Sequence, residues 1–405
     1  MSDVSNYPAQ TRREFATAAR RAPRIAFVIN SMEGGGAERA MANLLHHLEG
    51  RFPGMPVDLV LLDDLPIVQD IPAWIRVVTL DGRGKMLRSA RALGRYLLRT
   101  KPDLCLSYLA RANTLNVVFS ALTRHRAIIS ERVQTTSHLS TSRAGAIYRY
   151  ITRITYPRAF RVIAVSDGVA DDLINHFDVP RTKTRVIGNP IDAAALADKA
   201  RAPSELLAPL PERYLLGVGR MVVNKNFEML LDGYARANPS ADLVILGDGP
   251  DRPKLEAQIK ALGLSGRVHL PGFVPNPYPI MARAEALVSC SNAEGFPNTI
   301  IEAMALATPV IATDCPSGPA MVLRGKALKG APIESNARDG LLIRMGAREE
   351  LGRALTIFED PDIRHDYASR ARSRAAAFGV EAVVREYLDI IEDSLRSRAA
   401  NMGVK

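Results

Sequence analysis

Short, almost continuous apolar runs alternate along this chain with longer segments of helical periodicity, and the alternation occurs twice. In the first half the apolar runs cover residues 24–30, 57–62, 75–80, 104–107, 127–130, 161–165 and 185–187. In the second half they cover residues 214–218, 242–246, 267–270, 286–289 and 310–313. Val, Ile and Leu dominate these runs, which is typical of strands buried on both faces of a parallel sheet.

Helical patterns separate the apolar runs, and the clearest lie at residues 38–48, 85–100, 226–237 and 253–262. This βαβ order predicts parallel sheets with right-handed crossovers. We therefore expect an α/β protein with two Rossmann-like, doubly wound domains that face each other across a cleft. Ligands of such sheets bind beyond the C-terminal ends of the strands.

The length of 405 residues also favours two domains. Asn189-Pro190 breaks an element, and Pro203, Pro209 and Pro211 punctuate the segment before the next strand-like run. The sequence thus predicts a basic extension at residues 1–22, a first domain at 23–200, a second domain at 201–380 and a C-terminal helical segment at 381–405.

The net charge of +10 lies wholly in the first half of the chain. Residues 1–200 contain 28 Lys and Arg against 18 Asp and Glu, whereas residues 201–405 contain 25 of each class. A one-sided basic field suggests an anionic partner for the first half, such as a membrane surface, a polyphosphate or a nucleic acid.

Several sequence features predict a cytoplasmic location. The arginines of residues 1–22 precede no apolar signal region, and no run approaches the ~20 apolar residues of a membrane span. The three cysteines, Cys105, Cys290 and Cys315, lack CxxC spacing, so a disulfide framework or zinc site is not expected. They lie in or beside apolar runs and are expected to be small buried side chains.

A glycine-rich loop, Gly34-Gly35-Gly36, follows the first strand-like run and opens a helix. Glycines allow close backbone approach, and a helix N-terminus offers N–H groups to phosphate. A plain tight turn explains the loop about as well. The dinucleotide fingerprint is incomplete because Arg39 stands where its third glycine would be.

Two cations follow the first strand-like run of the second half, at Arg220 and Lys225. A guanidinium fork and an ammonium suit a diphosphate, although such residues in a loop are more often solvated. Gly247, in the turn 247–250, and Val274, in the segment 272–275, follow the next two strand-like runs. The backbone at 272–275 could therefore border a nucleobase.

The segment 291–305 carries the most specific pattern. Pro297 predicts a helix that begins there and runs to about residue 306, which places Glu294 before it and Glu302 within it. The helix N-terminus would point at a diphosphate, while the two carboxylates could accept hydrogen bonds from sugar and ribose hydroxyls.

Taken together, these motifs resemble the family 4 retaining glycosyltransferases of the GT-B architecture over residues 24–395. The segment 313–319 resembles a branch that acts on polysaccharides and lipid-linked oligosaccharides. The resemblance implies that Arg220 and Lys225 hold the donor diphosphate, Glu294 contacts the transferred sugar and Glu302 binds the ribose. It also implies that the last helix crosses back to the first domain. The implied donor-binding residues are Gly35, Gly36, Arg220, Lys225, Gly247, Val274, Glu294, Gly295, Phe296, Pro297, Asn298, Thr299 and Glu302.

The same resemblance implies a nucleotide-sugar substrate, with UDP as the default base, and no cofactor or metal. Asp63-Asp64 and Asp360-Pro361-Asp362 are interpreted as a strand end and a turn. Cations and helix dipoles would stabilise the leaving diphosphate, and its oxygen would take the acceptor proton during front-face attack. Many relatives have a catalytic histidine in the first domain, and His138 is the candidate here, although an isolated histidine is more often structural or exposed.

Basic residues of the first half suggest an acceptor or membrane surface. Arg88, Arg91 and Arg95 share one face of the predicted helix 85–100. Together with Arg132, Arg149 and Arg153 they could contact anionic lipid or a polyprenyl-diphosphate acceptor, at ~1 kcal/mol per residue, and a solvated face is the open alternative. We therefore expect peripheral association with the inner face of the cytoplasmic membrane.

Other functions remain open from the sequence. A nucleotide-sugar epimerase or glycan phosphorylase would share the architecture, and a non-catalytic protein that binds an anionic polymer would explain the basic half. Nucleic acid is not an expected partner because no recognised nucleic-acid module occurs. The sequence leaves the sugar, nucleotide, acceptor, linkage and oligomeric state unspecified.

Overall fold

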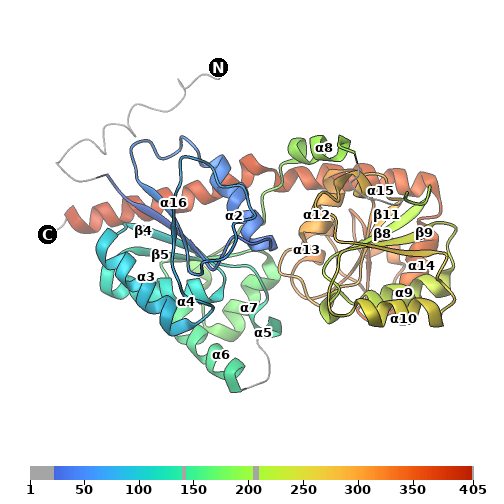
Figure 1. The fold of residues 1–405 in the computed structure, drawn as a ribbon, viewed down its shortest axis with the longest axis horizontal. Coiled ribbons are helices and arrows are strands. Elements are labelled where there is room, and N and C mark those ends of the chain that lie inside the picture. The colour runs from blue at the N-terminus through green and yellow to red at the C-terminus, as the bar shows by residue number, and fades with distance from the viewer. Residues whose placement is uncertain (1–21, 139–142, 204–208, 404–405) are drawn as a thin grey trace.

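The computed structural model describes residues 22–138, 143–203 and 209–403. Two parallel sheets lie side by side in it, each covered by helices on both faces (Figure 1). The expected α/β fold with two Rossmann-like domains is confirmed. The alternation of strands and helices produces it because each crossover helix covers the sheet that its strands build.

The first sheet has seven parallel strands in the order β3-β2-β1-β4-β5-β6-β7. The strands are β1 (Ile25–Ile29), β2 (Val57–Leu61), β3 (Arg76–Thr79), β4 (Leu104–Tyr108), β5 (Arg126–Glu131), β6 (Arg161–Ala164) and β7 (Thr184–Val186). The helices among and after them are α2 (Gly36–His47), α3 (Met86–Thr100), α4 (Ala110–Thr123), α5 (Thr135–His138), α6 (Arg143–Thr155), α7 (Asp167–Phe177) and α8 (Ala193–Arg201).

The second sheet has six parallel strands in the order β10-β9-β8-β11-β12-β13. They are β8 (Tyr214–Val218), β9 (Asp242–Leu246), β10 (Val268–Gly272), β11 (Ala286–Ser289), β12 (Val310–Thr313) and β13 (Leu341–Ile343). Its helices are α9 (Phe227–Ala237), α10 (Arg252–Ala261), α11 (Tyr278–Met281), α12 (Asn298–Ala305), α13 (Pro319–Leu323), α14 (Arg348–Ile357) and α15 (Pro361–Ala375). The sequence patterns did not predict β13, a strand of three buried apolar residues.

The strand order reverses between β1 and β4 in the first sheet and between β8 and β11 in the second. These switch points open a crevice at the C-terminal ends of the strands, where ligands of doubly wound sheets bind. The glycine-rich loop follows β1, whereas the loop with Arg220 follows β8 and the loop with Glu294 follows β11. The topology therefore places the three most informative motifs at switch points.

The last helix, α16 (Val380–Gly403), runs from the second domain across the first (Figure 1). Its apolar residues, which include Val383, Tyr387 and Ile391, are buried in the same core as Phe27 of β1 and Leu106 of β4. The Tyr108 hydroxyl donates to the Tyr387 hydroxyl at 2.8 Å within that core. The C-terminus of the chain thus completes the domain that the N-terminal half begins.

All three cysteines are free and buried, as expected for small apolar side chains in a core. Among the described residues, no helix is both long and apolar enough to span a membrane.

Candidate active site

Two glycine-containing loops of the second domain pack tightly against each other at the ends of β8 and β9. Gly247 has a φ of +127°, and a Cβ there would lie 2.0 Å from the carbonyl oxygen of Gly219. The Met221 N–H donates to the Asp248 carbonyl at 2.9 Å. A side chain at position 247 would separate the loops, so Gly247 fixes the backbone next to Arg220 rather than offering a contact of its own.

Lys225 and Glu294 form an ion pair at the centre of the site, with 2.5 Å between Nζ and Oε1. The Ser291 hydroxyl donates to the same Glu294 oxygen at 2.7 Å. The two loops that carry this pair are also joined directly, because the Asn224 side-chain amide donates to the Ala293 carbonyl at 2.9 Å. The structure therefore brings together the two charged residues that the sequence placed on separate loops.

Arg220 lies in the same loop as Lys225 and is exposed, and its guanidinium has no ion pair within the described residues. Glu294, by contrast, is only 14% exposed. A partly buried carboxylate and an accessible guanidinium, on two loops that are joined directly, offer hydrogen-bond acceptors for hydroxyl groups and donors for a phosphate.

Helix α12 begins at Asn298, one residue after the predicted start, and Pro297 precedes it. Pro297 and Phe296 are buried, and the Phe296 ring packs edge-on against Phe378 at 5.5 Å between centroids. Thr299 follows Asn298 in the first turn. This packing holds the helix N-terminus rigidly at the switch point, with its backbone N–H groups available to an anion.

The N-termini of α2 and α12 meet across the two domains. A Cβ at Gly36, the first residue of α2, would lie 2.9 Å from the side-chain nitrogen of Asn298. Gly35 is the preceding cap residue and is exposed. Two positive helix ends close to each other, with Lys225 and Arg220 nearby in the second domain, favour a doubly charged group such as a diphosphate.

An ion pair one turn further along joins the same helices. Arg39 of α2 donates to Glu302 of α12 at 2.9 Å and to the Tyr278 hydroxyl at 3.3 Å. Glu302 is 4% exposed, so burial raises its pKa, and the charge of Arg39 opposes that rise. Glu302 in turn raises the pKa of Arg39. The sequence patterns did not single out Arg39 as a partner of Glu302, because the pair is separated by 263 positions and only the fold brings it together.

Gly295 is a point of close backbone approach between the two domains. A Cβ at this position would lie 2.0 Å from the carbonyl oxygen of Arg132. Gly168 of the first domain similarly meets the backbone of Ser317, with 2.5 Å between its Cβ position and Cα. The absence of side chains at these positions permits the domains to approach as closely as they do.

Arg132 does not occupy the surface position that was expected for it. It is 6% exposed, its guanidinium stacks on Tyr108 at 4.5 Å, and one nitrogen donates to the Tyr387 hydroxyl at 3.2 Å. Helix α16 covers it, so contact between the Arg132 side chain and a membrane does not fit this arrangement. The neighbouring Glu131 is also buried, where burial raises its pKa and the Tyr156 hydroxyl donates to it at 2.6 Å.

Two further residues were expected in the site, Val274 and His138, and the structure places them differently. Val274 is buried in the core beside the end of β10, so only its backbone is available to a ligand. Phe273, which the sequence patterns did not select, is 76% exposed at the same strand end. His138 ends α5, and its side chain lies outside the part of the structure that is described.

The expected basic residues of α3 and α6 lie on a surface formed by α3, α4 and α6, which pack in that order. Arg88, Arg91 and Arg95 are exposed on α3, Arg149 is half-buried on α6, and Arg153 forms an exposed ion pair with Asp178. Exposed apolar side chains interrupt the same surface at Leu87, Leu98, Val118, Leu122, Ile147, Tyr150 and Ile154. We call this the α3–α4–α6 surface.

Within the described residues, no group of three or more His, Cys, Asp and Glu side chains is arranged to hold a metal ion. The cationic character of the crevice comes instead from Arg220, Lys225, Arg39 and the two helix ends.

Two family models match adjoining halves of the chain. The model for glycosyltransferase family 4 matches residues 34–195, and the model for glycosyl transferases group 1 matches residues 198–374. The chain is a family 4 glycosyltransferase. The first match ends and the second begins in the proline-bounded region between the sheets, and the second covers the loops with Arg220 and Glu294.

Curated relatives of the enzyme span nearly its whole length. One is the N-acetylgalactosamine-N,N'-diacetylbacillosaminyl-diphospho-undecaprenol 4-alpha-N-acetylgalactosaminyltransferase of Campylobacter jejuni, which is 29% identical over 90% of this chain and 98% of the relative. Another is the lipopolysaccharide core biosynthesis glycosyltransferase LpsE of Rhizobium meliloti, which is 26% identical over 88% of this chain and 96% of the relative.

Solved structures confirm the GT-B architecture of the enzyme. The structure of Anabaena HepE in complex with UDP superposes with a TM-score of 0.70, covers 91% of this chain and all of its own, and is 21% identical. The sucrose-phosphate synthase of Thermosynechococcus elongatus superposes with a TM-score of 0.74 over 93% of this chain and all of its own, at 19% identity. At these identities the likeness concerns the fold.

Proposed function

We propose that the enzyme transfers a hexose or N-acetylhexosamine, with retention of anomeric configuration, from a UDP-sugar to a cell-envelope glycan or lipid-linked oligosaccharide. The observation that carries this proposal is the meeting of α2 and α12 at their N-termini, next to Arg220 and to the Lys225–Glu294 pair. Helix ends and cations form a site for the donor diphosphate, and Glu294 lies where a sugar attached to that diphosphate would be.

The proposed chemistry places charge stabilisation in the second domain. As the bond between the sugar and the diphosphate lengthens, negative charge grows on the diphosphate, and Arg220, Lys225 and the start of α12 stabilise it. Glu294, held by Ser291 and Lys225, would accept hydrogen bonds from sugar hydroxyls and fix the orientation of the ring. The departing phosphate oxygen would take the acceptor proton on the same face, which retains the configuration.

Glu302 has a second expected role, in binding the ribose. Its carboxylate is engaged by Arg39 in this structure, so we infer that the donor ribose competes with or joins the Arg39 contact. The proposal requires no metal and no cofactor, because the cations of the crevice supply the positive charge that the leaving group needs.

A donor panel tests the proposal. UDP-, GDP- and ADP-sugars are screened by thermal shift and by hydrolysis against the wild type and Glu294→Ala. We expect one UDP-sugar to raise the melting temperature and to be turned over, and turnover to fall in Glu294→Ala. If no nucleotide-sugar stabilises the protein, with or without an added acceptor, the proposed donor site is wrong.

The stereochemistry and metal requirement need separate measurements. The anomeric coupling constant of the product, followed by proton NMR from the start of the reaction, should match that of the donor. Activity should persist after extensive dialysis against EDTA. An inverted product, or activity that returns only with a divalent cation, would contradict the respective part of the proposal.

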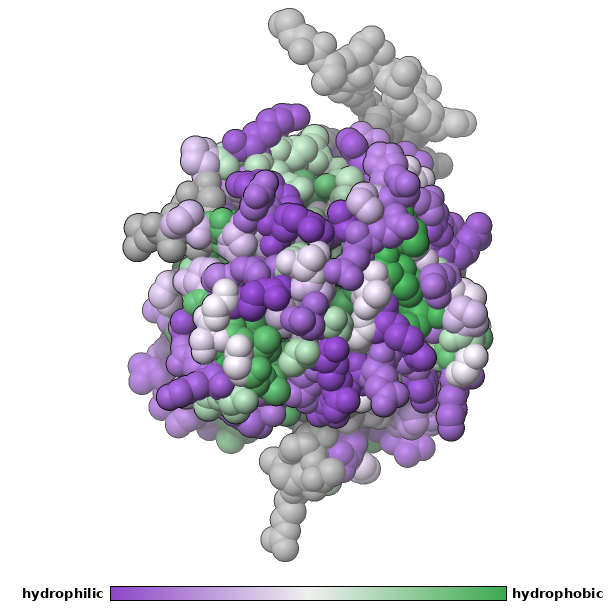
Figure 2. Space-filling model, turned by 90° about the vertical axis from the view of Figure 1, so that its right-hand side faces the viewer, coloured by the Kyte–Doolittle hydropathy of each residue, from purple (hydrophilic) through white to green (hydrophobic). Residues whose placement is uncertain are grey.

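The acceptor is proposed from two observations. The relatives from Campylobacter and Rhizobium are named for an undecaprenyl-diphosphate-linked glycan and for the lipopolysaccharide core. The α3–α4–α6 surface combines exposed arginines with exposed apolar side chains, the combination that suits an anionic bilayer surface. The outer end of the second domain is mainly hydrophilic, and its apolar areas are small and separate (Figure 2). We therefore propose that the first domain contacts the inner face of the cytoplasmic membrane.

Sedimentation with vesicles tests this placement. At low ionic strength the enzyme should sediment with phosphatidylcholine vesicles that carry phosphatidylglycerol and remain in the supernatant with phosphatidylcholine alone. Equal behaviour with both vesicle types would remove the membrane from the proposal and leave the donor reaction untouched.

A further inference from the structure

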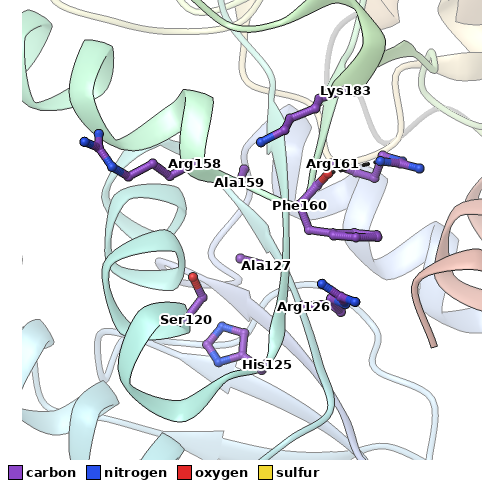
Figure 3. A pocket seen from close by; sticks show the side chains of 9 residues that line it. All are labelled: Ser120, His125, Arg126, Ala127, Arg158, Ala159, Phe160, Arg161 and Lys183. Carbon is purple, nitrogen blue, oxygen red and sulfur yellow. Dashed lines mark hydrogen bonds between the residues drawn. The ribbon is translucent and has the colours of Figure 1, made fainter. Parts of the chain in front are cut away.

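A pocket on the first domain lies away from the crevice, at the N-terminal ends of β5 and β6 (Figure 3). Its volume is about 360 Å³, within the range of small-molecule sites. The crevice lies at the opposite ends of these strands. Because β5 has six residues, the pocket is roughly 16 Å from the Arg132 end of the strand. The two sites are therefore separate.

Four cationic side chains line the pocket, and no acidic side chain does. They are Arg126, Arg158, Arg161 and Lys183. The fifth titratable residue of the lining, His125, is buried, and burial lowers its pKa to about 4, so it is neutral near pH 7. The lining of the pocket therefore carries only positive charge near pH 7, although the exposed Arg158 points away from Arg126 and Arg161 (Figure 3).

The cations are held mainly by neutral groups. Lys183 Nζ donates to the Pro157 carbonyl at 2.8 Å, and Arg158 donates to the Ile154 carbonyl. Arg126 donates to the Ser397 carbonyl of α16 at 3.3 Å. Carbonyl partners orient an ammonium or guanidinium group but leave its charge uncompensated. Among the four, Arg161 has a carboxylate partner, the half-exposed Asp393 of α16, at 3.1 Å.

The aromatic ring of Phe160 holds two of the guanidinium groups in place. Arg126 lies 4.4 Å and Arg161 lies 4.8 Å from the ring centroid. The buried Arg126 Nε has no hydrogen-bond partner. Burial, then the nearby charges of Arg398 and Arg161, lower the pKa of Arg126. A buried donor without a partner costs free energy, and an anion in the pocket would offset the repulsion between these like charges.

We propose that this pocket is a second anion site, which binds a phosphate-bearing group of about diphosphate size. Planar guanidinium groups donate in a fork that matches phosphate oxygens, and Lys183 adds a point charge. The phosphate group can belong to a soluble diphosphate or to a phospholipid head group at the membrane that the first domain is proposed to contact. Because α16 supplies Ser397 and Asp393, an anion there would also strengthen the attachment of the chain's last helix to the first domain.

The test must separate this pocket from the donor site, which is itself expected to bind a diphosphate. Inorganic pyrophosphate is titrated calorimetrically into the full chain with Arg220→Ala and Lys225→Ala, which weaken the crevice. We expect binding to persist in this background. We expect Lys183→Ala, added to it, to weaken binding about tenfold, the effect of one charge-assisted hydrogen bond. Arg353→Ala, which removes an exposed arginine of α14 in the second domain, is the matched control and should change nothing.

Two results would overturn the proposal. One is complete loss of pyrophosphate binding in the crevice background, and the other is binding that the pocket substitutions leave unchanged. Circular dichroism and melting temperature verify that each variant folds, and Lys183→Gln repeats the test with a side chain that can still donate to Pro157. Neither result depends on turnover, so a failure here is distinct from a failure of the proposed transferase reaction.

A vesicle experiment then identifies the source of the phosphate. The enzyme is sedimented with phosphatidylcholine vesicles that carry phosphatidylglycerol, in the presence and absence of saturating pyrophosphate. Release of the wild type, but not of Lys183→Ala, assigns the pocket to a lipid head group. Pyrophosphate binding with no release from the vesicles assigns it to a soluble anion.

Discussion

The two domains contribute to the crevice in different ways. The second domain provides charged side chains that are already fixed by one another, as in the Lys225–Glu294–Ser291 cluster. The first domain provides mostly backbone, at Gly36 and at the Arg132 carbonyl, together with the side chains of Arg39, which bridges to Glu302, and Asn189, whose amide donates to Asn298. A small ligand of fixed chemical structure is best recognised by charged side chains that are already held in place. A surface that only closes over the ligand instead needs small residues that leave space for it. The asymmetry suggests that the second domain recognises the donor and the first domain excludes water and presents the acceptor.

The largest effect is expected at the centre of the second-domain cluster. Glu294→Ala should lower kcat/KM by roughly 10²-fold to 10³-fold, since it removes the group that we propose orients the sugar and leaves Lys225 without its partner. Glu294→Gln should recover part of the loss because it keeps one oxygen. Steady-state kinetics with the identified donor measures both, and wild-type rates in Glu294→Ala would mean that the first domain carries the chemistry.

Acid should weaken the first domain selectively. Burial, and then the charge of Arg398, lower the pKa of His125 to about 4, against about 6.5 in an unfolded chain. The contribution of neutral His125 to the free energy of unfolding is therefore fully present above pH 6.5. This contribution falls by roughly 3 kcal/mol as the pH falls to about 4. His125→Gln should flatten this part of the profile. Calorimetric scans between these pH values measure it, and an identical slope in the variant would assign the acid sensitivity elsewhere.

A methyl group at the close approach between Gly295 and Arg132 should hinder closure. Gly295→Ala places a Cβ against the Arg132 carbonyl, and the strain of about 2 kcal/mol should lower kcat/KM roughly thirtyfold. UDP affinity should change little because the second domain keeps its cluster. Gly266→Ala is the matched control in the same domain, since a Cβ there meets no atom within 4 Å. Equal activities of the two variants would show that catalysis does not need this close approach.

The Arg39–Glu302 pair offers a measure of how strongly the domains are coupled. Arg39→Ala leaves Glu302 buried without its cation, which should cost about 2 kcal/mol of stability and lower the melting temperature. Adding Glu302→Gln should restore part of the loss, because the uncompensated buried charge is removed. Arg201→Ala, which breaks an exposed pair with Asp198, should have almost no effect. Additive effects of the Arg39 and Glu302 substitutions would mean that the two side chains do not interact in solution.

The smallest effects are expected on the α3–α4–α6 surface. Arg91→Ala or Arg95→Ala should each weaken binding to anionic vesicles about fivefold, the effect of one basic residue near a charged surface. Donor hydrolysis should stay unchanged. Vesicle binding that falls equally after Arg353→Ala in the second domain would erase the distinction between the two surfaces.

The sequence was informative where a local pattern determines a local structure. The buried strands β1 and β8 could be predicted from unbroken apolar runs, and the start of α12 was predicted within one residue because Pro297 restricts the chain. The meeting of Lys225 with Glu294 was not predicted, and it follows from the strand order of the structure, since both residues follow strands on either side of a switch point. The assignment of those residues to a diphosphate and a sugar remains a prediction.

The contacts that escaped prediction depend on segments far apart in the chain. Arg39 lies in an ordinary amphipathic helix and becomes significant only when α12 is placed beside it. Arg132 was predicted to be a surface cation, whereas in the structure Tyr387 of α16 accepts a hydrogen bond from its guanidinium. The basic pocket lies at the starts of two strands, and one of its arginines, Arg126, donates to a carbonyl near the end of the last helix. No periodicity or motif marks such sites, because their members have no fixed spacing.

The path of α16 has a consequence for how the protein is made. A ribosome releases the first domain long before the residues around Tyr387 exist, yet those residues belong to that domain's core. The nascent first domain therefore cannot complete its core until the second domain has been synthesised. Until then, the apolar face that α16 will cover is exposed and accessible to chaperones. A gene cut between the two sheets would yield an incomplete first half, and the final helix would have to be supplied to it.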